Sequence, residues 1–246
     1  MRLSKSKERQ NMKPILIFRH AATEGPGYLA TFLNNKNIPW ELIKVDEKVP
    51  LPVSIKDFSG MVLMGGPMSV NDVLPWIAPI LALIDEARSL DIPLLGHCLG
   101  GQLISKAFGA EITINAIKEI GWGEVTVSTN EIAKSLFGDL AQFNSFHWHG
   151  ETFSLPSGAT HLLSSPYCLN QAYSLGKHLA FQCHIEMTAD MIKTWCEVGE
   201  SELNDSASSA AVQNACDIQE NLSLHVLQLN KVANQVYSQW IKGLAA

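Results

Sequence analysis

Residues 92–102 read IPLLGHCLGGQ, and this stretch decides the interpretation of the fold. The apolar run Ile92–Leu95 is typical of a buried parallel strand, and Leu99–Phe108 has the pattern of a helix. Glycines on both sides of Cys98 allow a sharp strand-to-helix turn, which would present the thiol at the carboxyl edge of a sheet. A helix N-terminus there favours the thiolate. We interpret Cys98 as a candidate nucleophile; a buried cysteine in an ordinary turn is the alternative.

Strand and helix patterns alternate before this turn. The predicted strands are Pro14–Phe18, Trp40–Val45 and Phe58–Met64, and the predicted helices are Tyr28–Asn34 and Trp76–Leu90. This alternation predicts a single-domain α/β fold with a mostly parallel central sheet and helices on both faces. Shorter strands follow, with turns between them, at Val125–Val127, Phe143–Phe146, Thr160–Leu163, Ala172–Leu175 and Leu179–Phe181, and Thr188–Val198 is predicted as a helix. The short strands indicate antiparallel additions to the parallel core.

Composition and charge exclude several classes of protein. Of the 246 residues, 46% are hydrophobic and 17% are charged, which excludes a disordered chain. No apolar run approaches the roughly 18–20 residues that span a bilayer, so no membrane contact is expected. A formal charge of −6 argues against a nucleic-acid partner. The 5 cysteines are odd in number and show no C-x-x-C spacing, which indicates a reducing cytoplasmic location without a disulfide framework or a metal site.

The two ends of the chain differ from its middle. Residues 1–13 are predicted to be a basic flexible tail, and residues 14–200 the main domain. Residues 201–246 are expected to form a linker over Ser201–Ser209 and then one continuous amphipathic helix from Ala211 to Trp240. The apolar stripe of this helix is expected either to pack on the domain or to contact a partner, which leaves a homo-oligomer open.

A thiol nucleophile needs a base, and His184 is the candidate. It follows the predicted strand Leu179–Phe181, and Glu186 comes two residues later. Residues at this spacing in an extended segment face the same way, so the carboxylate can orient the imidazole. A surface histidine and glutamate are the alternative explanation of the H-x-E pattern. The pair Gly65-Gly66 follows another buried strand, and the backbone amides of Gly66 and Leu99 could form an oxyanion hole.

Three segments in this order, GGPMSV (65–70), GHCLGGQ (96–102) and FQCHIE (181–186), resemble the class I (triad) glutamine amidotransferase family, and in particular its stand-alone GMP-synthase-like members. The resemblance covers roughly residues 14–200 and implies a flavodoxin-like sheet. It also implies hydrolysis of the glutamine side-chain amide through a γ-glutamyl thioester. The roles that it implies are nucleophile, base and orienting carboxylate for Cys98, His184 and Glu186, oxyanion amides at Gly66 and Leu99, and substrate binding by Gly65, Gln102, Trp148, His149 and Gly150.

Two residues beside His184 differ from the family pattern, and two histidines near the substrate loop need an interpretation. The segment Phe146–Glu151 resembles the substrate loop of the family, and we expect His147 and His149 to be loop residues rather than catalytic groups. Cys183 and Ile185 replace an aromatic residue and a proline beside His184, and we do not expect Cys183 to be a second nucleophile. No P-loop pattern is present.

The expected ligand is glutamine or another γ-glutamyl substrate, with no metal and no cofactor. We expect no ammonia-accepting enzyme within these 246 residues, so any acceptor is expected to be a separate synthase subunit. Two alternatives remain open. One is a γ-glutamyl peptidase that uses the same triad on other γ-glutamyl compounds, and the other is a non-catalytic regulatory module on the same fold.

Overall fold

The structure, a computed structural model, describes residues 12–244, so the predicted basic tail lies almost wholly outside the described residues. The strands are β1 (Ile15–Arg19), β2 (Trp40–Lys44), β3 (Gly60–Leu63), β4 (Leu94–His97), β5 (Ile112–Val127), β6 (Gln142–Phe153), β7 (Thr160–Ser164), β8 (Ala172–Leu175), β9 (His178–Phe181) and β10 (Ala211–Val212). The helices are α2 (Gly27–Asn35), α3 (Ile77–Ser89), α4 (Leu99–Ala107), α5 (Glu131–Phe137), α6 (Ala189–Val198), α7 (Glu200–Asp205), α8 (Ala215–Gln219) and α9 (Leu222–Trp240), with short 3-10 helices at Val45–Glu47 and Ile241–Gly243.

All ten strands of the described residues belong to one sheet with the order β10-β5-β7-β8-β9-β4-β3-β1-β2, in which β6 also pairs with β5. The half that contains β9, β4, β3, β1 and β2 is parallel throughout. The carboxyl ends of these strands therefore meet at one edge, and the turn after β4 lies between the segments that follow β3 and β9. This arrangement confirms the predicted α/β fold with a mostly parallel core.

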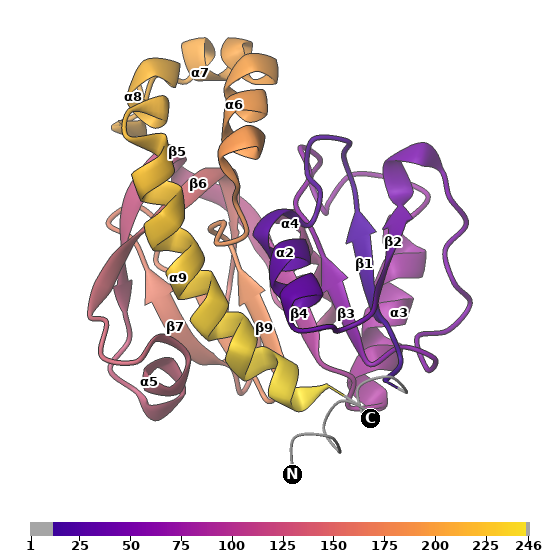
Figure 1. The fold of residues 1–246 in the computed structure, drawn as a ribbon. Coiled ribbons are helices and arrows are strands. Elements are labelled where there is room, and N and C mark those ends of the chain that lie inside the picture. The colour runs from indigo at the N-terminus through magenta and orange to yellow at the C-terminus, as the bar shows by residue number, and fades with distance from the viewer. Residues whose placement is uncertain (1–11, 245–246) are drawn as a thin grey trace.

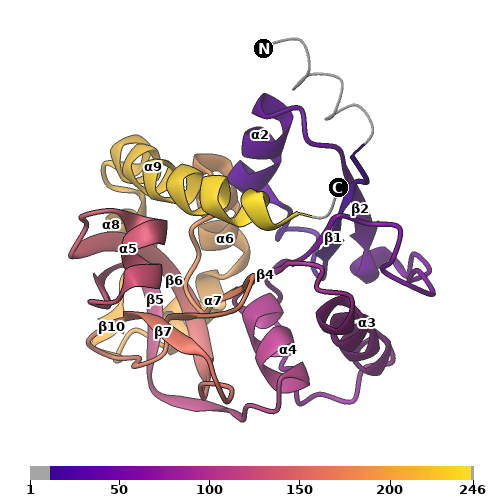
Figure 2. The ribbon, with the colours of Figure 1, turned by 90° about the horizontal axis from the view of Figure 1, so that it is seen from below.

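Helices cover both faces of the parallel half, as predicted (Figures 1 and 2). The helices α2 and α9 lie on one face and α3 and α4 on the other. Successive side chains of a strand point to opposite faces, and β1 shows the result: Ile15 and Ile17 join the core under α2 and α9, while Leu16 and Phe18 join the core under α3 and α4. Two apolar cores thus hold the central strands from both sides.

The antiparallel half has longer strands than the sequence predicted. Expected strands at Val125–Val127 and Phe143–Phe146 are the ends of β5 and β6, which span 16 and 12 residues. The pairing shifts register between Ile114 and Glu119, and both strands mix buried with exposed positions. A period-2 pattern interrupted in this way is hard to recognise, which explains the short prediction.

The C-terminal segment differs most from expectation. The predicted linker contains α7, and the predicted continuous helix is divided into β10, α8 and α9. The break before α9 falls at Asn221, whose φ of 50° is left-handed and ends the helical path. The apolar stripe of α9 packs on the domain, in the core that also contains Leu95, and the Trp240 indole donates a hydrogen bond to the Leu94 carbonyl at 3.1 Å.

Among residues 12–244, no helix combines the length and the apolar character that crossing a membrane requires.

Candidate active site

Cys98 occupies the turn between β4 and α4. Its φ of 49° and ψ of −110° are unusual for a residue with a side chain, and conformations of this kind occur often at functional sites. The Cys98 amide donates to the Phe181 carbonyl of β9 at 2.8 Å, which anchors the turn. Gly100 is required because a Cβ there would overlap the carbonyl of Leu63. The predicted strand–turn–helix context of Cys98 is present.

His184 and Glu186 lie together behind Cys98. His184 Nδ1 and Glu186 Oε1 are 2.6 Å apart, and both side chains are buried. Burial opposes the charge on each group and is the largest single influence, but the neighbouring charges and hydrogen bonds together outweigh it. The pKa of His184 is raised well above 6.5, with a contribution from the Cys98 thiol, which contacts the same ring. The pKa of Glu186 is lowered from 4.5 to about 2 by His97 and His184, against the raising effect of burial.

His97 is a second neighbour of the Glu186 carboxylate, which sequence reasoning missed. Its Nδ1 lies 3.2 Å from Glu186 Oε2, and its Nε2 is 3.3 Å from the Tyr237 hydroxyl on α9. Burial lowers the pKa of His97, so the ring is neutral near pH 7. A series of buried polar contacts therefore connects Tyr237 of α9 to His184 through His97 and Glu186. The position of His97, directly before Cys98, was a signal that could have been noticed.

A cavity of about 450 Å³ opens in front of Cys98. Most of the predicted site residues line it: Gly66, Cys98, Leu99, Gln102, Trp148, His149, Gly150 and His184. Glu186 lies behind His184, and Gly65 lies beside the ring, since a Cβ at Gly65 would come within 3.3 Å of His184 Cε1. The structure therefore brings all the predicted site residues to one place.

Polar groups at the back of the cavity surround the Cys98 sulfur. The Trp148 carbonyl is 3.9 Å from Sγ, and the Gln182 side-chain amide is 3.5 Å from it. Gln102 Nε2 donates to Gln182 Oε1 at 3.2 Å, so Gln102 is held beside the thiol. Gln182 was not among the predicted site residues, although it lies within the quoted FQCHIE segment.

The expectation that His147 and His149 lie in a loop is wrong, because both are buried within β6. His149 Nε2 is 3.1 Å from Glu119 Oε2, and burial lowers the pKa of His147 to about 4. The three side chains bring one atom each within 4.8 Å of one another, so they are the residues that could hold a metal ion. Both Glu119 oxygens also accept hydrogen bonds, from Ser165 at 2.8 Å and Gln171 at 2.7 Å.

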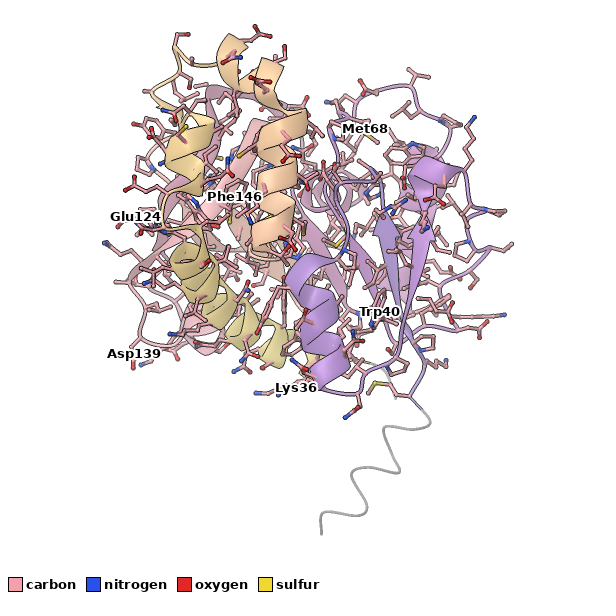
Figure 3. All side chains as sticks on the ribbon, turned by 45° about the horizontal axis from the view of Figure 1, so that its top comes forward. Lys36, Trp40, Met68, Glu124, Asp139 and Phe146 are labelled. Atoms are coloured by element: carbon pink, nitrogen blue, oxygen red, sulfur yellow. The ribbon has the colours of Figure 1, made fainter. Side chains whose placement is uncertain are left out.

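Three charged side chains of the cavity wall lie outside the segments quoted for the family resemblance. Lys118 and Glu202 form an ion pair at 2.6 Å, and Glu202 also accepts a hydrogen bond from the Trp148 indole at 2.8 Å. The third is Glu24, in the segment between β1 and α2. Their sequence surroundings carry no motif, and Glu202 falls in the segment that was expected to be a linker. Met68 and Glu202 line the same cavity. In Figure 3, Met68 lies across the top of the molecule from the helices α6 and α7.

Cys183 is not part of the cavity lining. Its thiol is fully buried, 3.9 Å from the Gln171 carbonyl and in contact with the Ser145 side chain. Burial raises the pKa of Cys183 to about 12, so the group stays protonated at neutral pH. This environment agrees with the expectation that Cys183 is not a nucleophile.

A parallel sheet whose edge presents a cysteine, a histidine and a glutamate in this order defines the class I amidotransferase type of α/β protein. The sequence model described as glutamine amidotransferase class-I matches residues 29–194, more than half of the chain, and the chain belongs to this family.

Two relatives and one solved structure illustrate the similarity. A crystal structure of a glutamine amidotransferase from Methylobacillus flagellatus superposes with a TM-score of 0.93 at 43% identity, covering 96% of each chain. Gamma-glutamyl peptidase 3 of Arabidopsis thaliana is 27% identical over 178 residues, which are 68% of this chain and 71% of that protein. A GMP synthase of Pelodictyon phaeoclathratiforme is 35% identical over 111 residues, 44% of this chain but 21% of the synthase.

Proposed function

We propose that this protein hydrolyses the side-chain amide of glutamine through a γ-glutamyl thioester on Cys98. The observation that carries the proposal is the 2.6 Å contact between His184 Nδ1 and Glu186 Oε1, with the Cys98 thiol against the same imidazole. A carboxylate in this position fixes the histidine tautomer and stabilises the imidazolium that forms when the thiol gives up its proton.

In the first half of the reaction, the Cys98 thiol passes its proton to His184, and the sulfur then attacks the γ-carbonyl carbon. The amides of Gly66 and Leu99 would stabilise the negative charge on the carbonyl oxygen. The carbon–nitrogen bond then breaks, His184 returns the proton to the nitrogen, and ammonia leaves. In the second half, His184 activates a water that attacks the thioester, and glutamate and the free thiol result.

The test compares the wild type with Cys98→Ala and with Cys216→Ala, a matched control because Cys216 is an exposed cysteine. Glutamate release from glutamine and from γ-glutamyl peptides is measured for each. We expect turnover in the wild type and in the control and none in Cys98→Ala. A glutamine-analogue electrophile should label Cys98. Labelling of Cys183, or equal turnover by all three proteins, would overturn the assignment.

A second candidate function is γ-glutamyl peptidase activity, in which an amine or amino acid leaves in place of ammonia. Two observations favour keeping it. The similarity to gamma-glutamyl peptidase 3 spans most of both chains, and the cavity of about 450 Å³ lies in the range of sites for ligands larger than one amino acid. The same panel of γ-glutamyl compounds separates the two activities.

An acceptor for ammonia is the remaining part of the proposal. The similarity to part of a GMP synthase supports a role beside a separate synthase subunit. Co-purification with such a subunit, and synthesis that depends on glutamine only when both are present, would test it. A non-catalytic regulatory module on the same fold is the contrasting outcome, and thiol-dependent turnover would exclude it.

A further inference from the structure

Glu24 is a carboxylate in the catalytic cavity without a polar partner. It lies in the segment between β1 and α2, and its side chain lines the cavity together with Cys98 and His184. A Cβ on Gly65 would overlap Glu24 Oε2 and would also lie 3.3 Å from His184 Cε1, so the carboxylate flanks the imidazole. Within residues 12–244 the Glu24 carboxylate makes no hydrogen bond and no ion pair.

This environment is costly for an unpaired negative charge. Burial raises the pKa of Glu24 to about 7; His184 lowers it and Glu186 raises it further. Glu24 is partly buried, and a partly buried carboxyl is stabilised when a cation or a hydrogen-bond donor satisfies it. The structure therefore presents an acceptor inside the cavity whose natural complement is a positively charged group.

The position of Glu24 assigns that group to one part of the substrate. His184 must deliver its proton to the leaving nitrogen, so that nitrogen lies next to the imidazole in the reaction proposed above. The Trp148 carbonyl lies 3.9 Å from the Cys98 sulfur, on the segment that resembles the substrate loop. Glu24 flanks the imidazole instead, and a substituent on the leaving nitrogen would extend past it.

The walls beside Glu24 suit an alkyl chain that ends in a cation. Trp195 packs edge-on against His184 with ring centroids 4.9 Å apart, and against Trp148 at 5.9 Å. The Trp195 indole donates to the Thr23 carbonyl at 2.9 Å, which ties this aromatic wall to the segment that carries Glu24. Aromatic faces accept both methylene groups and ammonium groups.

The lysine of the cavity does not pair with Glu24. Lys118 is the lysine of the cavity lining, and it is already paired with Glu202 at 2.6 Å. Glu151, a further carboxylate of the lining, accepts a hydrogen bond from the Ser69 hydroxyl at 2.9 Å. The lining thus holds three carboxylates against Lys118 and the His184 imidazole, whose pKa is raised. Negative charge is in excess, and a cavity lined by an excess of one charge attracts substrates of the opposite charge.

We propose that Glu24 and Trp195 form a subsite for a second ammonium group on the leaving amine, so that the preferred substrates are γ-glutamyl amides of diamines. This inference rests on the proposed function. The Cys98 sulfur forms a bond to the γ-carbonyl carbon, and the carbon–nitrogen bond breaks. His184 gives the former thiol proton to the leaving nitrogen, and the diamine departs with its second ammonium unchanged. Water then releases glutamate and restores the thiol.

The experiment compares three synthetic substrates that differ in the leaving group. The first is the mono-γ-glutamyl amide of 1,4-diaminobutane. The second is γ-glutamyl pentylamide, in which a methyl replaces the ammonium. The third is γ-glutamylglycine, whose carboxylate should be repelled. The enzymes are the wild type, Glu24→Gln, and Glu41→Gln as a control on an exposed glutamate of β2.

We expect the wild type and the control to prefer the diamine amide over the pentylamide by about tenfold to a hundredfold in kcat/KM, the range of one hydrogen bond to a charged group. Glu24→Gln should lose this preference, so that the ratio of kcat/KM for the diamine amide to kcat/KM for the pentylamide falls to about one. An equal loss on all substrates would show that Glu24 acts only through His184 and would overturn the subsite. Absence of any preference in the wild type would do the same.

A binding measurement separates failure of the subsite from failure of the catalytic proposal. In Cys98→Ala, calorimetry measures binding of the diamine amide and of the pentylamide without turnover. The diamine amide should bind about tenfold more tightly or better, and Glu24→Gln in this background should abolish the difference. If the wild type turns over no γ-glutamyl compound but this difference is present, the reaction is refuted and the subsite stands. Equal binding of the two amides refutes the subsite whatever the activity.

Discussion

Replacing Glu186 by glutamine keeps the shape of the side chain but removes the buried charge that faces His184 and His97. The carboxylate is 2.6 Å from His184 Nδ1 and 3.2 Å from His97 Nδ1, and it is 1% exposed, so solvent screens it little. The pKa of Glu186 falls from 4.5 to about 2 in the folded protein. At about 1.4 kcal/mol for each pKa unit, the ionised form contributes about 3 kcal/mol to the free energy of unfolding near pH 7.

We expect Glu186→Gln to lower the melting temperature at pH 7 by about 6–12 °C, since a domain of this size loses about 2–4 °C for each kcal/mol. The folded pKa is depressed, so the stability from the carboxylate is present above pH 4.5 and is lost as the pH falls toward 2. The difference between variant and wild type should therefore shrink across that window. Glutamate release should fall by about 10³–10⁴, because an amide cannot hold the productive tautomer of His184.

Differential scanning calorimetry from pH 3 to pH 8, together with a glutaminase assay, checks both parts. Glu197→Gln, at an exposed glutamate of α6, is the matched control and should change stability by less than about 0.5 kcal/mol. A Glu186→Gln protein as stable as the wild type at pH 7 would contradict the electrostatic reasoning. Activity within tenfold of the wild type would remove Glu186 from the proposed triad.

Three further predictions follow from contacts of the site. Gly100→Ala should destabilise the protein by about 2–4 kcal/mol in denaturant unfolding, because the added Cβ overlaps the Leu63 carbonyl; a loss below 0.5 kcal/mol would contradict this. Gly65→Ala should reduce the glutaminase kcat at least tenfold and leave the free energy of unfolding little changed, since its Cβ would occupy the space beside the imidazole. A normal kcat would show that the neighbouring side chains move to accept the added methyl group. Tyr237→Phe should cost about 1 kcal/mol of stability by removing the hydroxyl 3.3 Å from His97 Nε2, and an unchanged unfolding midpoint would show that the contact contributes nothing.

The parallel half of the fold was predictable because its strands other than the edge strand β2 are buried on both faces. Apolar runs such as Pro14–Phe18 and Ile92–Leu95 therefore carry an uninterrupted signal. The candidate triad was predictable for a different reason. Glycines around Cys98 mark a backbone path that few sequences allow, and the spacing of His184 and Glu186 puts both on one side of an extended segment.

Other parts depended on contacts that no local pattern records. The strand β5 mixes buried and exposed positions, so only its last residues resembled a strand. Asn221 adopts a left-handed conformation within an apolar stripe that continues on both sides of it, and the stripe concealed the break. Glu24 interacts with His184, and His97 contacts Glu186. Both partners are far away in the chain, so only folding brings these groups together.

The packing of α9 has a consequence for the order of events during protein synthesis. Tyr237 contacts His97, and Trp240 binds the Leu94 carbonyl of the strand that leads to Cys98. Because α9 is translated after every other element of the site, a nascent chain can contain Cys98, His184 and Glu186 while the strand behind them lacks this support. The contacts of Tyr237 and Trp240 with the strand before Cys98 therefore form last. Until α9 has been translated, the site lacks these contacts.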